Sequence, residues 1–174
     1  RPWSELSRMD AGGWHSRAFA GEPLPSLAAV ARYVQRNGFA LDLEIKPTPG
    51  QDDETGHVVA AEAARLWEGA PLPPLLSSFR PAALAAARAT APALPRALLL
   101  DELHAGWLDA ARALGCVAVV TQHRLMDATV AAQLHGAGLR ALCYTVNDAA
   151  EAARLRAAGV DGLITDAVDR FAPG

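Results

Sequence analysis

Short apolar runs alternate with amphipathic segments along most of the chain, and this pattern predicts strands and helices in turn. Strands are predicted over residues 40–46, 75–79, 98–100, 116–121, 139–146 and 160–165. Helices are predicted over residues 27–35, 55–67, 105–114, 127–135 and 148–158, with another that begins at Pro81 and a short last one over 166–171. Strands that alternate with helices in this way are typical of a parallel α/β sheet.

The first 25 residues show no sustained helical or strand periodicity of apolar positions. Glycines and prolines interrupt every candidate helix or strand, so this segment is predicted to be loop-like. Four apolar side chains within it are expected to anchor the loop onto the body of the domain, namely those of Leu6, Met9, Trp14 and Phe19.

Two parallel architectures fit the predicted β–α units: an open doubly wound sheet and a (β/α)8 barrel. A doubly wound nucleotide fold would place G-x-G-x-x-G after an early strand, and no turn of this sequence has it. Polar residues instead follow the strands, where a barrel has its active site; they are Glu44, Lys46, Ser77, Ser78, Asp101, Glu102, residues 121–123, Thr145, Asn147, Thr165 and Asp166. We therefore predict a TIM-type barrel, with about six of its eight units in this chain, because a complete barrel needs about 250 residues.

The predicted strand at residues 40–46 alternates between an apolar face and a charged face. The charged face consists of Asp42, Glu44 and Lys46. A parallel sheet is buried on both sides. Burying charged side chains there lowers the stability of the fold by several kcal/mol unless they form ion pairs or bind a ligand. Lys46 is also the only lysine of the chain, which uses arginine for every other permanent positive charge. This favours a functional Lys46, with an ion pair between Glu44 and Lys46 as the alternative, whereas Asp42 is predicted to be structural.

Composition is typical of a globular protein. With 174 residues, 18.2 kDa and 51% hydrophobic residues, the whole of 1–174 is predicted to be one domain. Basic residues are dispersed and the net charge is -3, which argues against nucleic acid as a partner. No apolar run approaches the roughly 18 residues of a membrane span. Cys116 and Cys143 fall in predicted strands and are expected to be buried free thiols, which favours a reducing, cytoplasmic location.

Four motifs follow one another along the chain: LEIKP at residues 43–47, SSF at 77–79, YTVN at 144–147 and GVDGLITD at 159–166. In this order they resemble the successive strand signatures of the glycerophosphodiester phosphodiesterases. The opening is also similar to the segment that this family places between its second and third strands, through DAGGW at 10–14, FAG at 19–21 and PSL at 25–27. The resemblance covers essentially the whole chain.

The resemblance implies a barrel enzyme that hydrolyses glycerophosphodiesters, such as glycerophosphocholine, to glycerol 3-phosphate and an alcohol. It implies a Ca²⁺ or Mg²⁺ ion held by carboxylates, with Glu44 as a metal ligand and Lys46 as a phosphate contact. Tyr144 stands where the family usually has tryptophan, as an aromatic wall for the substrate. Phe79, Tyr144 and Asn147 are therefore candidates for substrate contacts. Core packing of the two aromatic residues and capping of the next helix by Asn147 are the alternatives.

The sequence also departs from the family. The family carries His-Arg-Gly on its first strand, Glu-x-Asp on its second and a His-Asp soon after, and this sequence contains none of them. Because those residues supply the acid–base histidines and further metal ligands, the resemblance implies the C-terminal two-thirds of a domain that is inactive without its upstream segment. An alternative is a non-catalytic barrel remnant that binds a phosphorylated small molecule or a partner chain. A phosphatidylinositol-type phospholipase barrel shares the chemistry but fits the four motifs less well.

Overall fold

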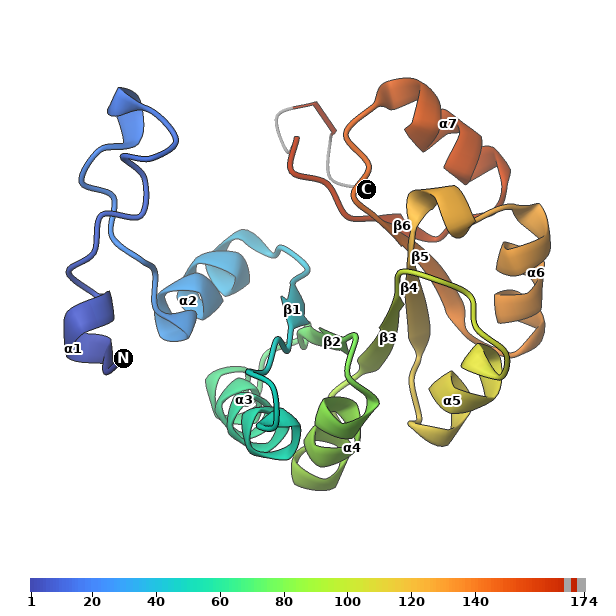
Figure 1. Ribbon diagram of the computed structural model, residues 1–174, viewed down its shortest axis with the longest axis horizontal. Coiled ribbons are helices and arrows are strands. Elements are labelled where there is room, and N and C mark those ends of the chain that lie inside the picture. The colour runs from blue at the N-terminus through green and yellow to red at the C-terminus, as the bar shows by residue number, and fades with distance from the viewer. Residues whose placement is uncertain (168–169, 172–174) are drawn as a thin grey trace.

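The computed structural model describes residues 1–167, 170 and 171, and it contains one parallel sheet with the strand order β1-β2-β3-β4-β5-β6 (Figure 1). The strands are β1 (Asp42–Glu44), β2 (Leu75–Ser78), β3 (Arg96–Leu100), β4 (Ala118–Gln122), β5 (Arg140–Tyr144) and β6 (Gly162–Leu163). Each strand is hydrogen-bonded in parallel to the next strand of the chain. The sheet curls into a half-barrel, which confirms the predicted α/β fold and its six strands.

Helices connect the strands and cover the convex side of the sheet (Figure 1). The helices of the β–α units are α3 (Asp52–Leu66), α4 (Pro81–Thr90), α5 (Trp107–Ala113), α6 (Ala128–Gly136) and α7 (Ala149–Ala157). The chain before β1 forms α1 (Trp3–Leu6), the 3-10 helix η1 (Arg17–Phe19) and α2 (Leu27–Asn37), and η2 (His123–Leu125) follows β4. In the described part of the chain, no helix has the length and apolar character that crossing a membrane requires.

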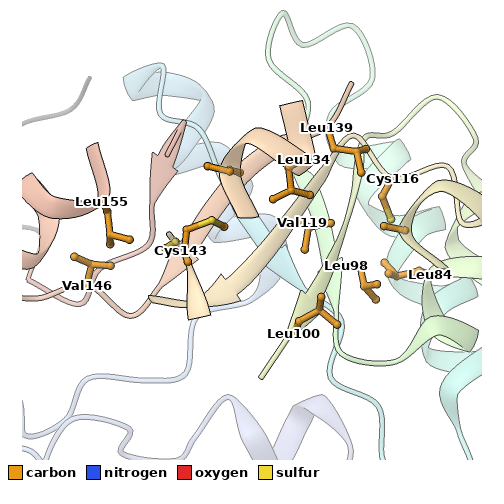
Figure 2. Packing of buried hydrophobic residues seen from close by; sticks show 14 of the residues in the cluster. Leu84, Leu98, Leu100, Cys116, Val119, Leu134, Leu139, Cys143, Val146 and Leu155 are labelled. Atoms are coloured by element: carbon orange, nitrogen blue, oxygen red, sulfur yellow. The ribbon is translucent and has the colours of Figure 1, made fainter. Parts of the chain in front are cut away.

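The main core lies between the sheet and its outer helices. Leu98 of β3, Val119 of β4 and Cys143 of β5 belong to it, together with Leu84 of α4 (Figure 2). Cys116 is part of the same core but precedes β4 rather than lying within it. Both cysteines are free and buried, as predicted, and burial raises the pKa of each thiol to about 11.

The concave face of the sheet carries the alternate residues of the same strands. Ala97 and Leu99 of β3 form a buried apolar cluster there with Ala118 and Val120 of β4. The register of β3 and β4 pairs Ala97 with Ala118 and Leu99 with Val120. Paired residues of neighbouring parallel strands project on the same side, so these small and medium side chains form an apolar floor for the concave side.

The first 25 residues do not anchor onto the body in the predicted way. Trp14 is 84% exposed, Phe19 is 49% exposed and Met9 is 44% exposed. The rings of Trp14 and Phe19 instead contact His15 edge-to-face, with centroids 5.8 and 5.3 Å from the imidazole. Leu6 is half-buried, and within the described residues none of the four side chains belongs to a buried core cluster, so the expected anchoring was wrong.

The capping residue of α7 also differs from the prediction. The Asp148 carboxylate, and not Asn147, accepts the hydrogen bond from the backbone N–H of Glu151 at 2.9 Å. Aspartate and asparagine are nearly equal as caps, so local preference could not choose between two adjacent candidates. The predicted last helix, over 166–171, includes residues 168 and 169, which lie outside the described residues.

Helices α3 and α4 approach each other closely at Gly56. A Cβ atom at this position would collide with the carbonyl oxygen of Ala83 and would lie 2.9 Å from the Cβ of Ala86. We expect Gly56→Ala to lower the free energy of unfolding by about 1–3 kcal/mol in urea denaturation, because neither neighbour can yield without shifting a helix. Gly136→Ala in α6 is the matched control, since its Cβ would meet nothing within 4 Å. It should leave stability equal or raise it by about 1 kcal/mol, and equal effects of the two substitutions would contradict the close packing.

Candidate active site

The charged face of β1 lies on the concave side of the half-barrel. The register pairs Glu44 with Ser77 and Ser77 with Ala97, which belongs to the concave apolar floor. Asp42 lies two residues before Glu44 and therefore shares its side of the sheet. Ile45 is 1% exposed and packs into the core between the sheet and its helices. The predicted division of this strand into an apolar and a charged face is thereby confirmed.

Glu44 and Lys46 lie where β1 ends, at the edge at which the parallel strands have their carboxyl ends. Lys46 comes two residues after Glu44, just beyond the strand, and both residues are exposed. Within residues 1–167, 170 and 171, neither takes part in an ion pair. The alternative in which Glu44 and Lys46 satisfy each other is therefore wrong for this structure, and both charges are free to meet a ligand.

A second carboxylate lies deeper on the same face. One carboxylate oxygen of Asp42 and the hydroxyl of Ser77 are buried and have no hydrogen-bond partner among the described residues. Burial raises the pKa of Asp42, the nearby hydroxyl of Ser77 opposes this, and the charge of Glu44 adds to the rise. Because a buried polar atom without a partner costs about 1–3 kcal/mol, we expect a water molecule or a polar ligand atom to bind here.

Two of the predicted substrate-binding residues meet over the concave floor. The rings of Phe79 and Tyr144 are perpendicular, with centroids 5.7 Å apart. Phe79 directly follows β2 and Tyr144 is the last residue of β5, so the contact joins two strands that are not neighbours in the sheet. The Tyr144 hydroxyl donates a hydrogen bond of 3.1 Å to the carbonyl oxygen of Leu100. Burial raises the pKa of Tyr144, and the negative charges of Asp101 and Glu44 raise it further. The hydroxyl of Tyr144 thus lies at the end of β3.

Asp101 and Ser78 were predicted to lie at strand ends, but neither was assigned to the site. For Asp101 the available signal was an acidic residue directly after a buried strand. Ser78 is fully buried, and its hydroxyl donates to the carbonyl oxygen of Ile45 at 2.6 Å and accepts from the backbone N–H of Arg80 at 3.1 Å. Ser78 therefore fixes the end of β1, and with it Glu44, to the end of β2.

Asn147 has a definite position but no demonstrated ligand contact. Its carboxamide oxygen accepts hydrogen bonds from the Thr165 hydroxyl at 2.9 Å and from the backbone N–H of Asp166 at 3.0 Å. Its amide group donates to the Asp166 carboxylate at 3.4 Å. Asn147 thus joins the ends of β5 and β6, and its contact with substrate stays a prediction.

Two of the five histidines, His123 and His135, contact carboxylates of α7 and of the residue just before β6. His123, just after β4, contacts Glu151 of α7 with 2.6 Å between Nδ1 and a carboxylate oxygen. Hydrogen bonds from Arg154 and His123 lower the pKa of Glu151 to about 2. His135 of α6 contacts Asp161 at 2.9 Å. Among the described residues, no group of three or more His, Cys, Asp and Glu side chains could hold a metal ion.

These features define the class of the protein. It is an α/β half-barrel of the TIM type whose strand ends present a carboxylate, an ammonium group and an aromatic pair, which suits a phosphorylated ligand. The chain belongs to the glycerophosphoryl diester phosphodiesterase family, whose model matches residues 1–170. This confirms the resemblance that the four sequence motifs indicate.

Relatives of known sequence or structure agree with this family. The chain is 29% identical over 171 residues to “Putative glycerophosphodiester phosphodiesterase YhdW” of Bacillus subtilis, covering 95% of this chain and 68% of that protein. A phosphodiesterase of Oleispira antarctica, solved in complex with the product sn-glycerol-3-phosphate, is 28% identical with a TM-score of 0.85, over 95% of this chain and 66% of that one. A glycerophosphodiester phosphodiesterase of Parabacteroides distasonis shares the fold, with a TM-score of 0.72 and 16% identity over 97% of this chain and 68% of that one. The chain thus spans about two thirds of the length of these relatives.

Proposed function

We propose that this chain carries the metal- and phosphate-binding side of an enzyme that hydrolyses glycerophosphodiesters to glycerol 3-phosphate and an alcohol. The observation that carries the proposal is the position of Glu44 at the end of β1 and of Lys46 just beyond it, both exposed and neither in an ion pair with any described residue. Family membership supports this reaction, and so does the product bound to the Oleispira antarctica relative.

Lys46 is assigned the phosphate contact. A compact ammonium with three donors can approach a phosphodiester oxygen directly and offset the charge that develops on the phosphoryl group. Lys46 can do so because its side chain is at the rim of the concave face and has no carboxylate partner among the described residues.

We further propose Ca²⁺ or Mg²⁺ as the cofactor, with Glu44 as one ligand. Both ions prefer oxygen ligands, and Mg²⁺ commonly combines one or two carboxylates with water and substrate phosphate. The exposed carboxylate of Glu44 fits this donor set, and the unpartnered oxygen of Asp42 lies on the same face. The described residues form no group of three or more ligands, so water and phosphate would complete the coordination. When bound, such a cation acts as a Lewis acid toward a phosphoryl oxygen.

A direct assay of the full-length protein tests the proposed function. Glycerophosphocholine, glycerophosphoethanolamine and glycerophosphoglycerol are each incubated with Ca²⁺, with Mg²⁺ or with EDTA, and released glycerol 3-phosphate is followed by a coupled assay. We expect release in the presence of one of the cations and its loss in EDTA. Glycerol 3-phosphate itself should not be cleaved to inorganic phosphate. Absence of release from all three diesters with either cation would overturn the proposal.

A second candidate function is phosphate-ester binding without turnover. It is supported by the placement of His123 and His135, whose ring nitrogens contact the carboxylates of Glu151 on α7 and of Asp161 just before β6 rather than residues of the concave face. This candidate expects glycerol 3-phosphate to bind to the chain while no diester is hydrolysed under any metal condition. The same assay, combined with calorimetric titration of glycerol 3-phosphate, separates the two candidates.

A further inference from the structure

The chain segment that connects β1 to α3 begins with Lys46 and is held at both of its ends. At the near end, the hydroxyl of Ser78 donates a hydrogen bond of 2.6 Å to the carbonyl oxygen of Ile45, directly before Lys46. At the far end, Nε of Arg80 donates to a carboxylate oxygen of Asp52 at 2.6 Å. The Ser78 hydroxyl also accepts from the backbone N–H of Arg80 at 3.1 Å. One short segment after β2 therefore fixes both ends of the connection.

The middle of the connection is a tight turn. The backbone N–H of Gln51 donates to the carbonyl oxygen of Thr48 at 2.9 Å, which closes a β-turn. Its two central residues are Pro49 and Gly50, and Gly50 has a φ of 84°. A proline followed by a glycine with positive φ is typical of a type II turn. Because the proline ring fixes its own φ, the connection has few alternative paths.

The ion pair between Arg80 and Asp52 spans the first turns of two helices that are packed tightly together. Asp52 is the first residue of α3, and Arg80 directly precedes α4. The two helices approach so closely at Gly56 that a Cβ atom there would collide with the backbone of Ala83. The Arg80 side chain is 60% exposed, and exposed ion pairs contribute little to stability. Its effect on the connection that it holds is therefore the more important one.

We propose that Arg80 and Asp52 are positioning residues for Lys46. This inference rests on the phosphate contact that the proposed function assigns to Lys46. A lysine side chain has a flexible four-carbon stem, so the position of its ammonium group depends on how firmly its own backbone is held. Without the ion pair, the far end of the connection is released and the backbone of Lys46 can shift. A shift of about 1 Å in a group that acts on the reacting atoms is enough to slow a reaction strongly.

Kinetics of full-length variants test this role. Arg80→Met removes the donor to Asp52 and should lower kcat for the diester that is hydrolysed fastest by about tenfold, with KM changed less than about twofold. Arg80→Lys should recover part of the loss. In protein that already carries Lys46→Met, Arg80→Met should have no further effect, because the group that it positions is absent.

The matched control is Arg65→Met, which breaks another exposed ion pair. Arg65 pairs with Glu62 within α3, and its side chain is 63% exposed, close to the 60% of Arg80. This variant should keep the kcat of the unmodified protein. Asp52→Asn breaks the proposed positioning pair from its other side and should reproduce the effect of Arg80→Met, which keeps the test valid if one of these two variants does not fold.

A spectroscopic measurement reports on Lys46 without turnover. The full-length protein is isotopically labelled at the ε-carbon of lysine, and the NMR signal of Lys46 is identified by its absence from Lys46→Met. Saturating sn-glycerol 3-phosphate should shift this signal in the unmodified protein and in Arg65→Met. The shift should be smaller in Arg80→Met, in which the ammonium group is no longer held against the phosphate.

The possible outcomes separate the positioning role from the proposed function. Unchanged kcat in Arg80→Met would overturn the positioning role and leave the proposed function intact, and so would an equal loss of kcat with and without Lys46. If no diester is hydrolysed, the proposed function fails and the Lys46 signal decides: a smaller shift in Arg80→Met supports positioning, and an equal shift overturns it. A Lys46 signal that does not respond to glycerol 3-phosphate in the unmodified protein would overturn both the phosphate contact and the positioning role.

Discussion

Replacing Lys46 by methionine is expected to lower kcat for glycerophosphodiester hydrolysis by about 100- to 1000-fold, the usual effect of removing one donor that stabilises transition-state charge. Methionine keeps the length and apolar character of the side chain but removes its charge. Because Lys46 is exposed and has no partner among the described residues, its loss should not affect folding. Steady-state kinetics and circular dichroism on the same preparation measure both effects.

Two further variants sharpen the test of Lys46. Lys46→Arg should restore only part of the activity, because a planar guanidinium does not replace a compact ammonium that meets a phosphate oxygen. Arg32→Met, on the exposed side of α2, removes a positive charge elsewhere and should leave kcat unchanged. Near-normal turnover by Lys46→Met would remove Lys46 from the reaction.

Replacing Glu44 by glutamine is expected to weaken Ca²⁺ or Mg²⁺ binding by at least about 10- to 100-fold, since even outer partners of metal ligands have effects of this size. The substitution preserves shape and removes one negative charge from the strand end. Activity should fall in parallel and recover in part at high concentrations of the cation. Calorimetric titration of each cation measures the affinity directly, independent of turnover.

The control for this substitution is Glu68→Gln, which changes an exposed glutamate after α3 that has no ion-pair partner among the described residues. It should bind the cation as the unmodified protein does. If Glu44→Gln and Glu68→Gln had the same affinity for both cations, Glu44 could not be a metal ligand. The cation would then have to bind to other residues.

The parts of the fold that follow from local patterns could be predicted from the sequence. Alternation along residues 40–46 was sufficient to place Glu44 and Asp42 on one side and Ile45 on the other, because the period of a strand is two residues. Alternating strands and helices with polar residues at the strand ends likewise predicted the half-barrel. These inferences need only the order of residues along the chain.

Contacts between distant segments could not be predicted in this way. The perpendicular contact of Phe79 with Tyr144 depends on how strongly the sheet curls. The sequence of a single strand carries no information about this curvature. The exposure of Trp14 could not be predicted for a related reason. The sequence shows that the side chain is large and apolar, but not whether another part of the fold packs against it. The absence of an ion pair between Glu44 and Lys46 depends on the directions of two flexible side chains.

The order of the six strands in space repeats their order along the chain, and this has a consequence for how the domain assembles. Every new strand pairs with the one synthesised just before it, so each pairing closes a single β–α unit, such as Asp42 with Leu75 and Ala97 with Ala118. Parallel pairing across a whole unit is still a non-local contact, which makes sheet formation slow compared with helix formation. Synthesis proceeds from the N-terminus, so each β–α unit that leaves the ribosome meets a neighbour that is already available. The sheet can thus grow one strand at a time during translation, and β6 is the last of the described strands to join.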